Sequence, residues 1–133
     1  MPDERRADLC NYRMKNSEDS LTAAEDCLEK GLYRDAINRS YYAAFYAIKA
    51  LLALEEVDFK RHKDVVAYFN RTYAATEKIP REIGRKLARL QQKREKSDYD
   101  DFYIASKEET MEQIENTKSV ILAVKDYLSR MEN

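Results

Sequence analysis

The side chains best suited to bind or cleave a phosphate group lie in two short basic segments of the chain. The first segment, KRHKD, contains His62, which is the only histidine in the sequence. An imidazole titrates near neutral pH, so His62 is the one imidazole available as a general acid or base. The second segment, REKSDY, begins at Arg94, whose planar guanidinium can bind a phosphate through two parallel hydrogen bonds. His62 and Arg94 are therefore the candidate catalytic residues.

Both residues also have a purely structural interpretation. A histidine at the start of a helix commonly caps the helix or lies on the surface. Arg94 could pair with Asp98 or Asp101 and lock the end of its helix. In the functional alternative, His62 and Lys63 line a groove that also receives Arg94. The residue types alone leave these alternatives open.

A row of basic residues accompanies Arg94 on the same predicted helix. Arg81, Arg85 and Arg89 repeat at intervals of four, and Lys93 and Lys96 continue the row, which gives the helix one cationic face. Such a face neutralises phosphates, and binding through it weakens as the salt concentration rises. The alternative is a solvated surface that is offset by neighbouring acidic helices.

The overall net charge hides how strongly these bases are concentrated. The 133-residue chain has a formal net charge of −1, but residues 60–96 contain twelve Lys or Arg and only four Asp or Glu. This distribution implies one basic surface on an otherwise acidic body. Tyr99, which follows the basic segment, could stack on a base or position a ligand. The candidate ligand-binding residues are Lys63, Arg85, Arg89, Lys93, Arg94, Asp98 and Tyr99.

Other kinds of site find no support in the sequence. Neither Cys10 nor Cys27 has a partner at metal-ligand spacing, and the two glycines stand apart, so we expect no metal and no cofactor. The two cysteines lie on one predicted helix, too far apart to pair, which favours a reducing, cytoplasmic location. No apolar run approaches the roughly 20 residues that span a bilayer, so no membrane association is expected.

The elements that would position these residues are helices. The composition favours helix over sheet, because the chain contains only two Gly and two Pro. Ser106 and Glu109 match a capping box for the last helix, and residues 97–106 are expected to be the longest irregular stretch. The expected fold is an all-α, antiparallel up-and-down bundle of four to five helices in one domain, residues 1–133. The helices are expected at about 5–30, 33–54, 62–73, 80–96 and from the Ser106 cap to 131.

The second of these helices is the most apolar. A helix that is apolar on nearly all sides must be covered on nearly all sides, which predicts a central bundle helix, a subunit interface, or both. Tyr42, Tyr46 and Lys49 occupy its remaining arc. Its large apolar stripe consists of Ile37, Tyr41, Ala44, Phe45, Ile48 and Leu52. A second stripe of small side chains consists of Ala36, Ser40, Ala43, Ala47 and Ala50.

Three pieces of the sequence together resemble the HEPN family of small helical-bundle proteins. They are RSYYAAFYAIKALL at residues 39–52, RHKDVVAYF at 61–69 and REKSDY at 94–99. The resemblance is closest to small stand-alone prokaryotic HEPN proteins, which often accompany a minimal nucleotidyltransferase. It implies an up-and-down bundle, usually a homodimer with a cleft at the ends of the central helices. The better-known active members are metal-independent ribonucleases, many of them toxins of toxin–antitoxin pairs.

The chain departs from the signature of those ribonucleases, which is an arginine, four to six further residues and then a histidine. If Arg94 takes the place of the arginine, the histidine positions are Tyr99, Asp100 and Asp101. His62 would then have to compensate from a different helix or from the second subunit.

The sequence thus predicts a dimeric HEPN-type module that binds RNA or a nucleotide phosphate and works with a nucleotidyltransferase in a toxin–antitoxin-like pair. Arg94 and Lys93 would bind the phosphate, with His62 and Lys63 lining the cleft. The first alternative is a metal-independent ribonuclease toxin that uses His62 with Arg94. The second is a non-catalytic interaction module that dimerises through its apolar second helix and docks on an acidic protein.

Overall fold

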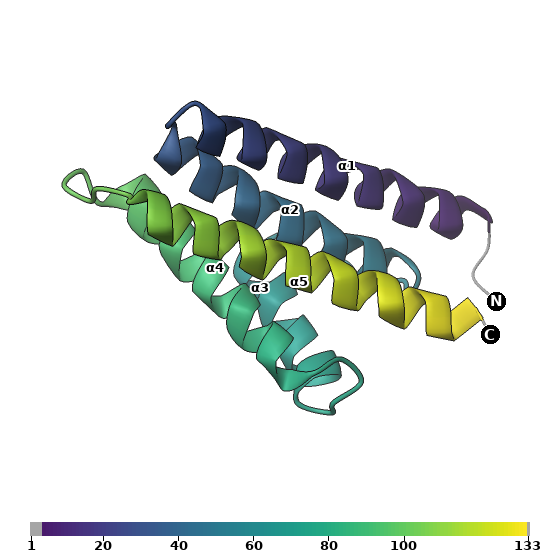
Figure 1. Cartoon of the computed structure of the whole chain (residues 1–133). Coiled ribbons are helices and arrows are strands. Elements are labelled where there is room, and N and C mark those ends of the chain that lie inside the picture. Colours follow the sequence, from purple (N-terminus) through teal and green to yellow (C-terminus); the bar gives the residue numbers. More distant parts are fainter. Residues whose placement is uncertain (1–3, 133) are drawn as a thin grey trace.

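The computed structural model describes residues 4–132 and consists of helices packed side by side (Figure 1). None of the described residues forms a strand, which confirms the predicted all-α, antiparallel bundle. α1 and α2 form an antiparallel hairpin, and α5 runs beside α2 (Figure 1). In chain order the elements are α1 (Glu4–Glu29), α2 (Tyr33–Ala53), α3 (His62–Phe69), the π-helical turn η1 (Asn70–Ala74), α4 (Arg81–Tyr99) and α5 (Lys107–Glu132).

The centre of this bundle is α2, whose large and small stripes are both buried. Its small residues let two neighbouring helices approach closely enough for side chains to bond to its backbone. The Ser17 hydroxyl of α1 donates to the Ala43 carbonyl at 2.6 Å, and the Thr117 hydroxyl of α5 donates to the Ser40 carbonyl at 2.7 Å. The predicted central bundle helix is therefore confirmed within a single chain.

The C-terminal end of α4 differs from the sequence-based prediction. The helix continues through Tyr99, so residues 97–99 are helical and the irregular segment begins only at Asp100. The cause is an arginine from another helix: the Arg34 guanidinium donates to the Ser97 carbonyl and lies 3.4 Å from the Asp100 carbonyl oxygen. These bonds occupy carbonyls that the end of a helix otherwise leaves without a partner.

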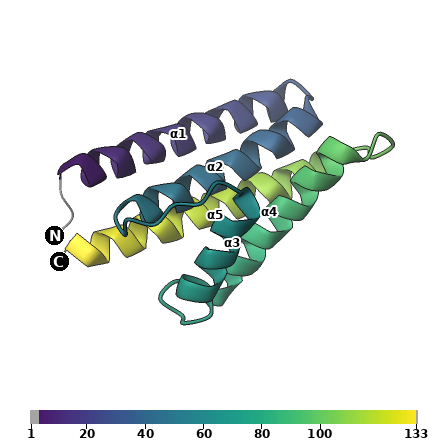
Figure 2. The ribbon, with the colours of Figure 1, turned by 180° about the vertical axis from the view of Figure 1, so that it is seen from behind.

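The third helix also differs from the expectation, because its last turns widen into η1. Figure 2 shows α3 lying against α4 on the side of the bundle away from α1. The turn η1 meets α4 at Gly84, where an added Cβ would lie 2.7 Å from Asn70 Oδ1 and 2.9 Å from Ala74 Cβ. Only a residue without a side chain allows this approach, which fixes α4 relative to η1, directly after the end of α3.

The final helix begins as the capping pattern predicts. The backbone N–H of Glu109 donates to the Ser106 hydroxyl at 3.0 Å. The Glu109 carboxylate does not complete the box, because it accepts a hydrogen bond from the Tyr103 hydroxyl instead. Within residues 4–132, no helix combines the length and the apolar character that crossing a bilayer requires.

Candidate functional site

The side chain of Arg94 lies on a different side of α4 from the exposed basic row. Arg94 follows Arg89 by five residues, which turns it about 140° around the helix. Its side chain is only 18% exposed and faces α2, whereas Arg85 and Arg89 are exposed and make no ion pair with any described residue. Lys93 is half-buried and lies 3.9 Å from Glu109 of α5. The predicted basic residues therefore do not form one surface.

Arg94 rests on two tyrosine rings of α2. Its guanidinium carbon lies 5.3 Å from the Tyr41 ring centroid and 5.6 Å from that of Tyr42, within the range of a cation–π interaction. Its Nη2 donates to the Tyr42 hydroxyl at 3.5 Å. Its Nε lies 3.1 Å from Asp98 Oδ2, which confirms the ion pair that the sequence offered as the structural alternative. That contact lacks hydrogen-bond geometry, so the buried Nε–H has no acceptor among the described residues.

The ring of His62, the first residue of α3, packs on the same group of aromatic side chains. Its centroid lies 4.1 Å from that of Phe45, 5.7 Å from that of Tyr42 and 6.0 Å from that of Tyr41. Its Nδ1 lies 3.3 Å from the Tyr41 hydroxyl oxygen. His62 is thus half-buried against α2 and does not cap its helix, because Arg61 holds the cap position. The structure thus brings His62 and Arg94 onto one group of aromatic side chains, Tyr41, Tyr42 and Phe45, which we call the aromatic floor.

Burial in this site keeps both the His62 imidazole and the Tyr41 phenol neutral near pH 7. Burial, followed by the positive charges of Arg94 and Lys49, lowers the pKa of His62 below its ordinary value. Burial raises the pKa of Tyr41 to about 12, although Arg94 opposes that change. A neutral imidazole can accept a proton, and an anion placed beside it would favour the protonated form. The site therefore combines one permanent cation with one group that is able to become a second.

The lowered pKa of His62 predicts how the free energy of unfolding depends on pH. Because the unfolded chain binds the proton more readily, the stability that neutral His62 provides is complete above about pH 6.5. It is lost as the pH falls through the lower pKa of the folded state. We expect urea unfolding curves to show this loss in the wild type, and the loss to be smaller in His62→Gln. Equal pH dependence in the two proteins would contradict the prediction.

The remaining predicted site residues lie outside the aromatic floor. Lys63 is exposed beside His62, and Asp98 belongs to the site only as the ion partner of Arg94. Tyr99 is 78% exposed and extends from the end of α4 together with Phe102 (93%) and Ile104 (87%) of the following loop. We call Tyr99, Phe102 and Ile104 the apolar tip. Tyr99 does not contact the floor.

The sequence analysis predicts Tyr41 and Phe45 as members of the apolar stripe, and both are buried in the core. It does not predict that they and Tyr42 together contact His62 and Arg94, because an apolar helix face carries no mark that separates packing from function. One signal was present: Tyr42 and Lys49 are seven residues apart on the only arc of α2 that is not apolar. Lys49 binds Asp58 and contributes to the lowered pKa of His62.

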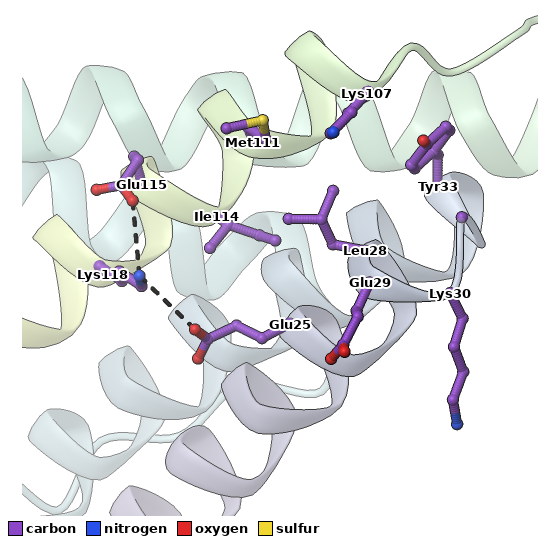
Figure 3. A pocket seen from close by; sticks show the side chains of 11 residues that line it. Glu25, Leu28, Glu29, Lys30, Tyr33, Lys107, Met111, Ile114, Glu115 and Lys118 are labelled. Atoms are coloured by element: carbon purple, nitrogen blue, oxygen red, sulfur yellow. Dashed lines mark ion pairs between the residues drawn. The ribbon is translucent and has the colours of Figure 1, made fainter.

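A large hollow lies away from this site, between the end of α1 and the start of α5 (Figure 3). It has a volume of about 750 Å³ and an apolar floor that includes Leu28 and Ile114. Lys118 lies 3.7 Å from Glu25 and 3.5 Å from Glu115, and the hollow is lined by three lysines and three glutamates (Figure 3). These opposite charges offset one another, so the hollow offers no net attraction to a phosphate.

Comparison with known proteins finds similarity over most of the chain. The HEPN domain family matches residues 10–127. A UPF0332 protein of Thermotoga maritima is 28% identical over 120 residues, covering 90% of this chain and 91% of the relative. "Putative toxin MJ0605" of Methanocaldococcus jannaschii is 36% identical over 83 residues, or 62% of each chain. The crystal structure of an archaeal HEPN homologue shares the fold, with a TM-score of 0.72 and 21% identity over 88% of this chain and 95% of its own.

Proposed function

Since this chain belongs to the HEPN domain family, we propose that it binds RNA or a nucleotide phosphate through Arg94, as one member of a toxin–antitoxin-like pair. The observation that carries the proposal is a largely buried arginine that contacts two tyrosine rings, one of which also contacts the only imidazole of the chain. The relative from Methanocaldococcus jannaschii that carries a toxin name supports the toxin–antitoxin part. The proposed partner is a nucleotidyltransferase, as the resemblance to small prokaryotic HEPN proteins implies.

The guanidinium of Arg94 is suited to bind a phosphate. Its Nη2 and Nε contact the Tyr42 hydroxyl and Asp98, and once these contacts are exchanged this edge would present two parallel N–H groups, which match the oxygens of a phosphate. The Asp98 carboxylate lies 3.1 Å from the guanidinium Nε and would exchange with an incoming phosphate. The exposed Arg85 and Arg89 would act differently, by attracting the RNA backbone at long range.

Binding of a mixed RNA pool at two salt concentrations, without divalent metal, tests this division of roles. We expect charge reversal at Arg85 and Arg89 to weaken binding and to reduce its dependence on salt, because fewer counterions are released. Substitution of Arg94 should weaken binding at both salt concentrations. If charge reversal at Arg85, Arg89 and Arg94 together leaves the affinity unchanged, the proposed function is wrong.

One geometric observation also favours the alternative of a metal-independent ribonuclease. His62 and Arg94 lie on the same tyrosine rings, so one phosphodiester could reach both. A neutral His62 would accept the proton of the attacking ribose hydroxyl, whose oxygen would bond to phosphorus as the bond to the leaving oxygen breaks. The protonated His62 would then give that proton to the leaving oxygen, while Arg94 would stabilise the negative charge that develops on the phosphate. This alternative predicts that expression arrests growth and that His62→Ala relieves the arrest. A harmless wild-type protein that leaves RNA intact would exclude it.

Homodimerisation, the other part of the proposal, is supported by the apolar tip. Three large apolar side chains within six residues are more exposed than a monomer ordinarily leaves such a group. A second copy that covers them would also bring the tip close to an aromatic floor, since Tyr99 belongs to the same helix as Arg94. The proposed dimer would then place two phosphate sites near one interface.

Changing Phe102 and Ile104 to serine together is expected to convert the dimer into a monomer in sedimentation experiments. Burying each such side chain contributes about 1.5–3 kcal/mol, and four would be lost from a symmetric dimer. Leu122→Ser is the control, because Leu122 is 69% exposed but lies on α5, away from the tip. A tip variant that stays dimeric, or a Leu122 variant that dissociates equally, would place the interface elsewhere.

A further inference from the structure

A second hollow, of about 410 Å³, lies between α1 and α2 beside the aromatic floor. We call it the α1–α2 groove. Its volume falls within the roughly 300–1,000 Å³ of typical small-molecule sites. Polar and aromatic side chains dominate its lining, in contrast to the apolar floor of the larger hollow. They include Tyr12, Asn16, Asp19 and Ser20 of α1 and Arg39 and Tyr46 of α2.

Arg39 is held in this groove in the same way as Arg94 is held in the neighbouring site. Its guanidinium carbon lies 5.0 Å from the Tyr42 ring centroid. Its Nε and Nη2 donate to Asn38 Oδ1 at 3.1 and 2.6 Å, which fixes the plane of the guanidinium. Two oriented arginines therefore contact one tyrosine ring, Arg94 from the side of α4 and Arg39 from the side of the groove.

Aromatic rings continue from the floor into the groove. The Tyr46 ring centroid lies 6.0 Å from that of Tyr42, and Tyr46 lines the groove. Tyr12, across from it on α1, is 60% exposed and makes no ring contact or hydrogen bond with any described residue. An exposed ring of this kind offers a face on which a base can stack. Asn16, Asp19 and Ser20 add short donors and acceptors, which suit a ribose or the edge of a base.

We propose that the α1–α2 groove is a nucleoside subsite, which takes the base and ribose next to the phosphate bound at Arg94. Tyr12 and Tyr46 contact the base of this nucleoside. Arg39 binds a phosphate that links the nucleoside to its neighbour in the strand. Asp19 is paired with Lys15 at 3.3 Å and is suited to accept hydrogen bonds from a ribose. This inference rests on the proposed phosphate binding at Arg94, and it identifies the ligand as a single-stranded nucleic acid with at least one unstacked base.

Two ligands separate the subsite from the phosphate site: a mixed-sequence RNA trinucleotide and an abasic ribose-phosphate trimer of equal charge. We expect the wild type to bind the trinucleotide more tightly than the abasic trimer. Tyr12→Ala should lower affinity for the trinucleotide by between about fivefold and a hundredfold, the range of one base–aromatic stack, and leave the abasic trimer unaffected. Tyr12→Phe should retain most of the affinity. Tyr33→Ala, at the larger hollow, is the control and should change neither.

The outcomes distinguish failure of the subsite from failure of the phosphate site. Equal affinity of wild type and Tyr12→Ala for both ligands, with affinity still lost in Arg94→Ala, would overturn the subsite alone. Absence of binding to either ligand by the wild type would overturn both proposals. A Tyr12→Ala protein that changes its sedimentation behaviour would show that a second copy covers the groove, which also overturns the subsite. Circular dichroism of each variant establishes that it is folded.

Discussion

Replacing Arg94 with alanine is expected to weaken RNA binding by roughly a hundredfold or more. A hydrogen bond to a charged group contributes about 1.5–3 kcal/mol, and the guanidinium would make two with the same phosphate. Arg94→Lys should recover only part of the loss, because an ammonium keeps the charge but cannot present two parallel donors. Fluorescence anisotropy with a labelled RNA pool measures each affinity directly.

The chain contains a matched control for this substitution in Arg130. Arg130 Nε lies 3.2 Å from Asp126 Oδ2, and its guanidinium carbon lies 5.7 Å from the Tyr127 ring centroid. It therefore repeats the ion pair and the aromatic contact of Arg94 on α5, without an imidazole or a second arginine beside it. Arg130→Ala should leave the affinity unchanged. Equal losses in the two variants would mean that binding follows net charge alone, and the assignment of Arg94 would be wrong.

Loss of binding in Arg94→Ala should not arise from unfolding. The ion pair with Asp98 is half-buried, but its Nε–Oδ2 contact lacks hydrogen-bond geometry, so we expect it to contribute no more than about 1 kcal/mol to stability. The substitution also relieves a buried Nε–H that has no acceptor, which offsets part of the lost contact. We expect the urea midpoints of Arg94→Ala and the wild type to lie close together. A large drop in the midpoint would require the binding data to be corrected for the unfolded fraction.

Gly84→Ala is expected to destabilise the fold by about 1–3 kcal/mol, although alanine normally favours a helix over glycine by about 1 kcal/mol. The close contact of the added Cβ destabilises the fold, whereas the higher helix propensity of alanine stabilises it. The sign of the change in the free energy of unfolding therefore shows which effect is larger. The added Cβ would meet Ala74 Cβ at 2.9 Å, and Ala74 has no flexible side chain that can move away. Helix α4 and the turn η1 would have to separate. Urea denaturation followed by circular dichroism gives the change in free energy.

A double variant tests whether this contact is the cause. Asn70→Ala removes the other close atom, Oδ1, and should restore part but not all of the stability lost in Gly84→Ala. Gly31→Asn is the comparison, because a Cβ added at Gly31 would meet nothing within 4 Å. Gly31 has a φ of +77°, a conformation that asparagine tolerates. A Gly84→Ala protein more stable than the wild type would show that α4 moves away at little cost.

Most of the fold could be predicted from the sequence, because its determinants are local. The two stripes of α2 predicted that other helices pack on both of its sides, and the Ser106 hydroxyl predicted the start of α5. The end of α4 could not be predicted in this way. Its last turn depends on Arg34, which lies 63 residues earlier in the chain and reaches the Ser97 carbonyl only in the folded bundle. Local propensity carries no information about such a contact.

The candidate site could be predicted only in part. Residue chemistry selected His62 and Arg94, and the structure places them on the same rings. The spacing along α4 also separates Arg94 from the basic row, because a step of five residues, from Arg89 to Arg94, crosses to another face of the helix. The α1–α2 groove had no counterpart in the sequence, because it depends on how far two helices stand apart at Tyr12 and Tyr46.

The two hydroxyl bonds to the backbone of α2 have a consequence for how proteins of this family diverge. Ser17 and Thr117 bind the Ala43 and Ser40 carbonyls from opposite sides, so they fix the rotation of α2 about its own axis. With that rotation fixed, the outward arc of α2 can change its side chains without altering the packing beneath. Relatives with different ligand preferences are therefore expected to vary at positions 39, 42 and 46, and to keep small residues or hydroxyls at the four positions of the two bonds. The packing of α2 would thus stay the same among relatives while the side chains at positions 39, 42 and 46 change.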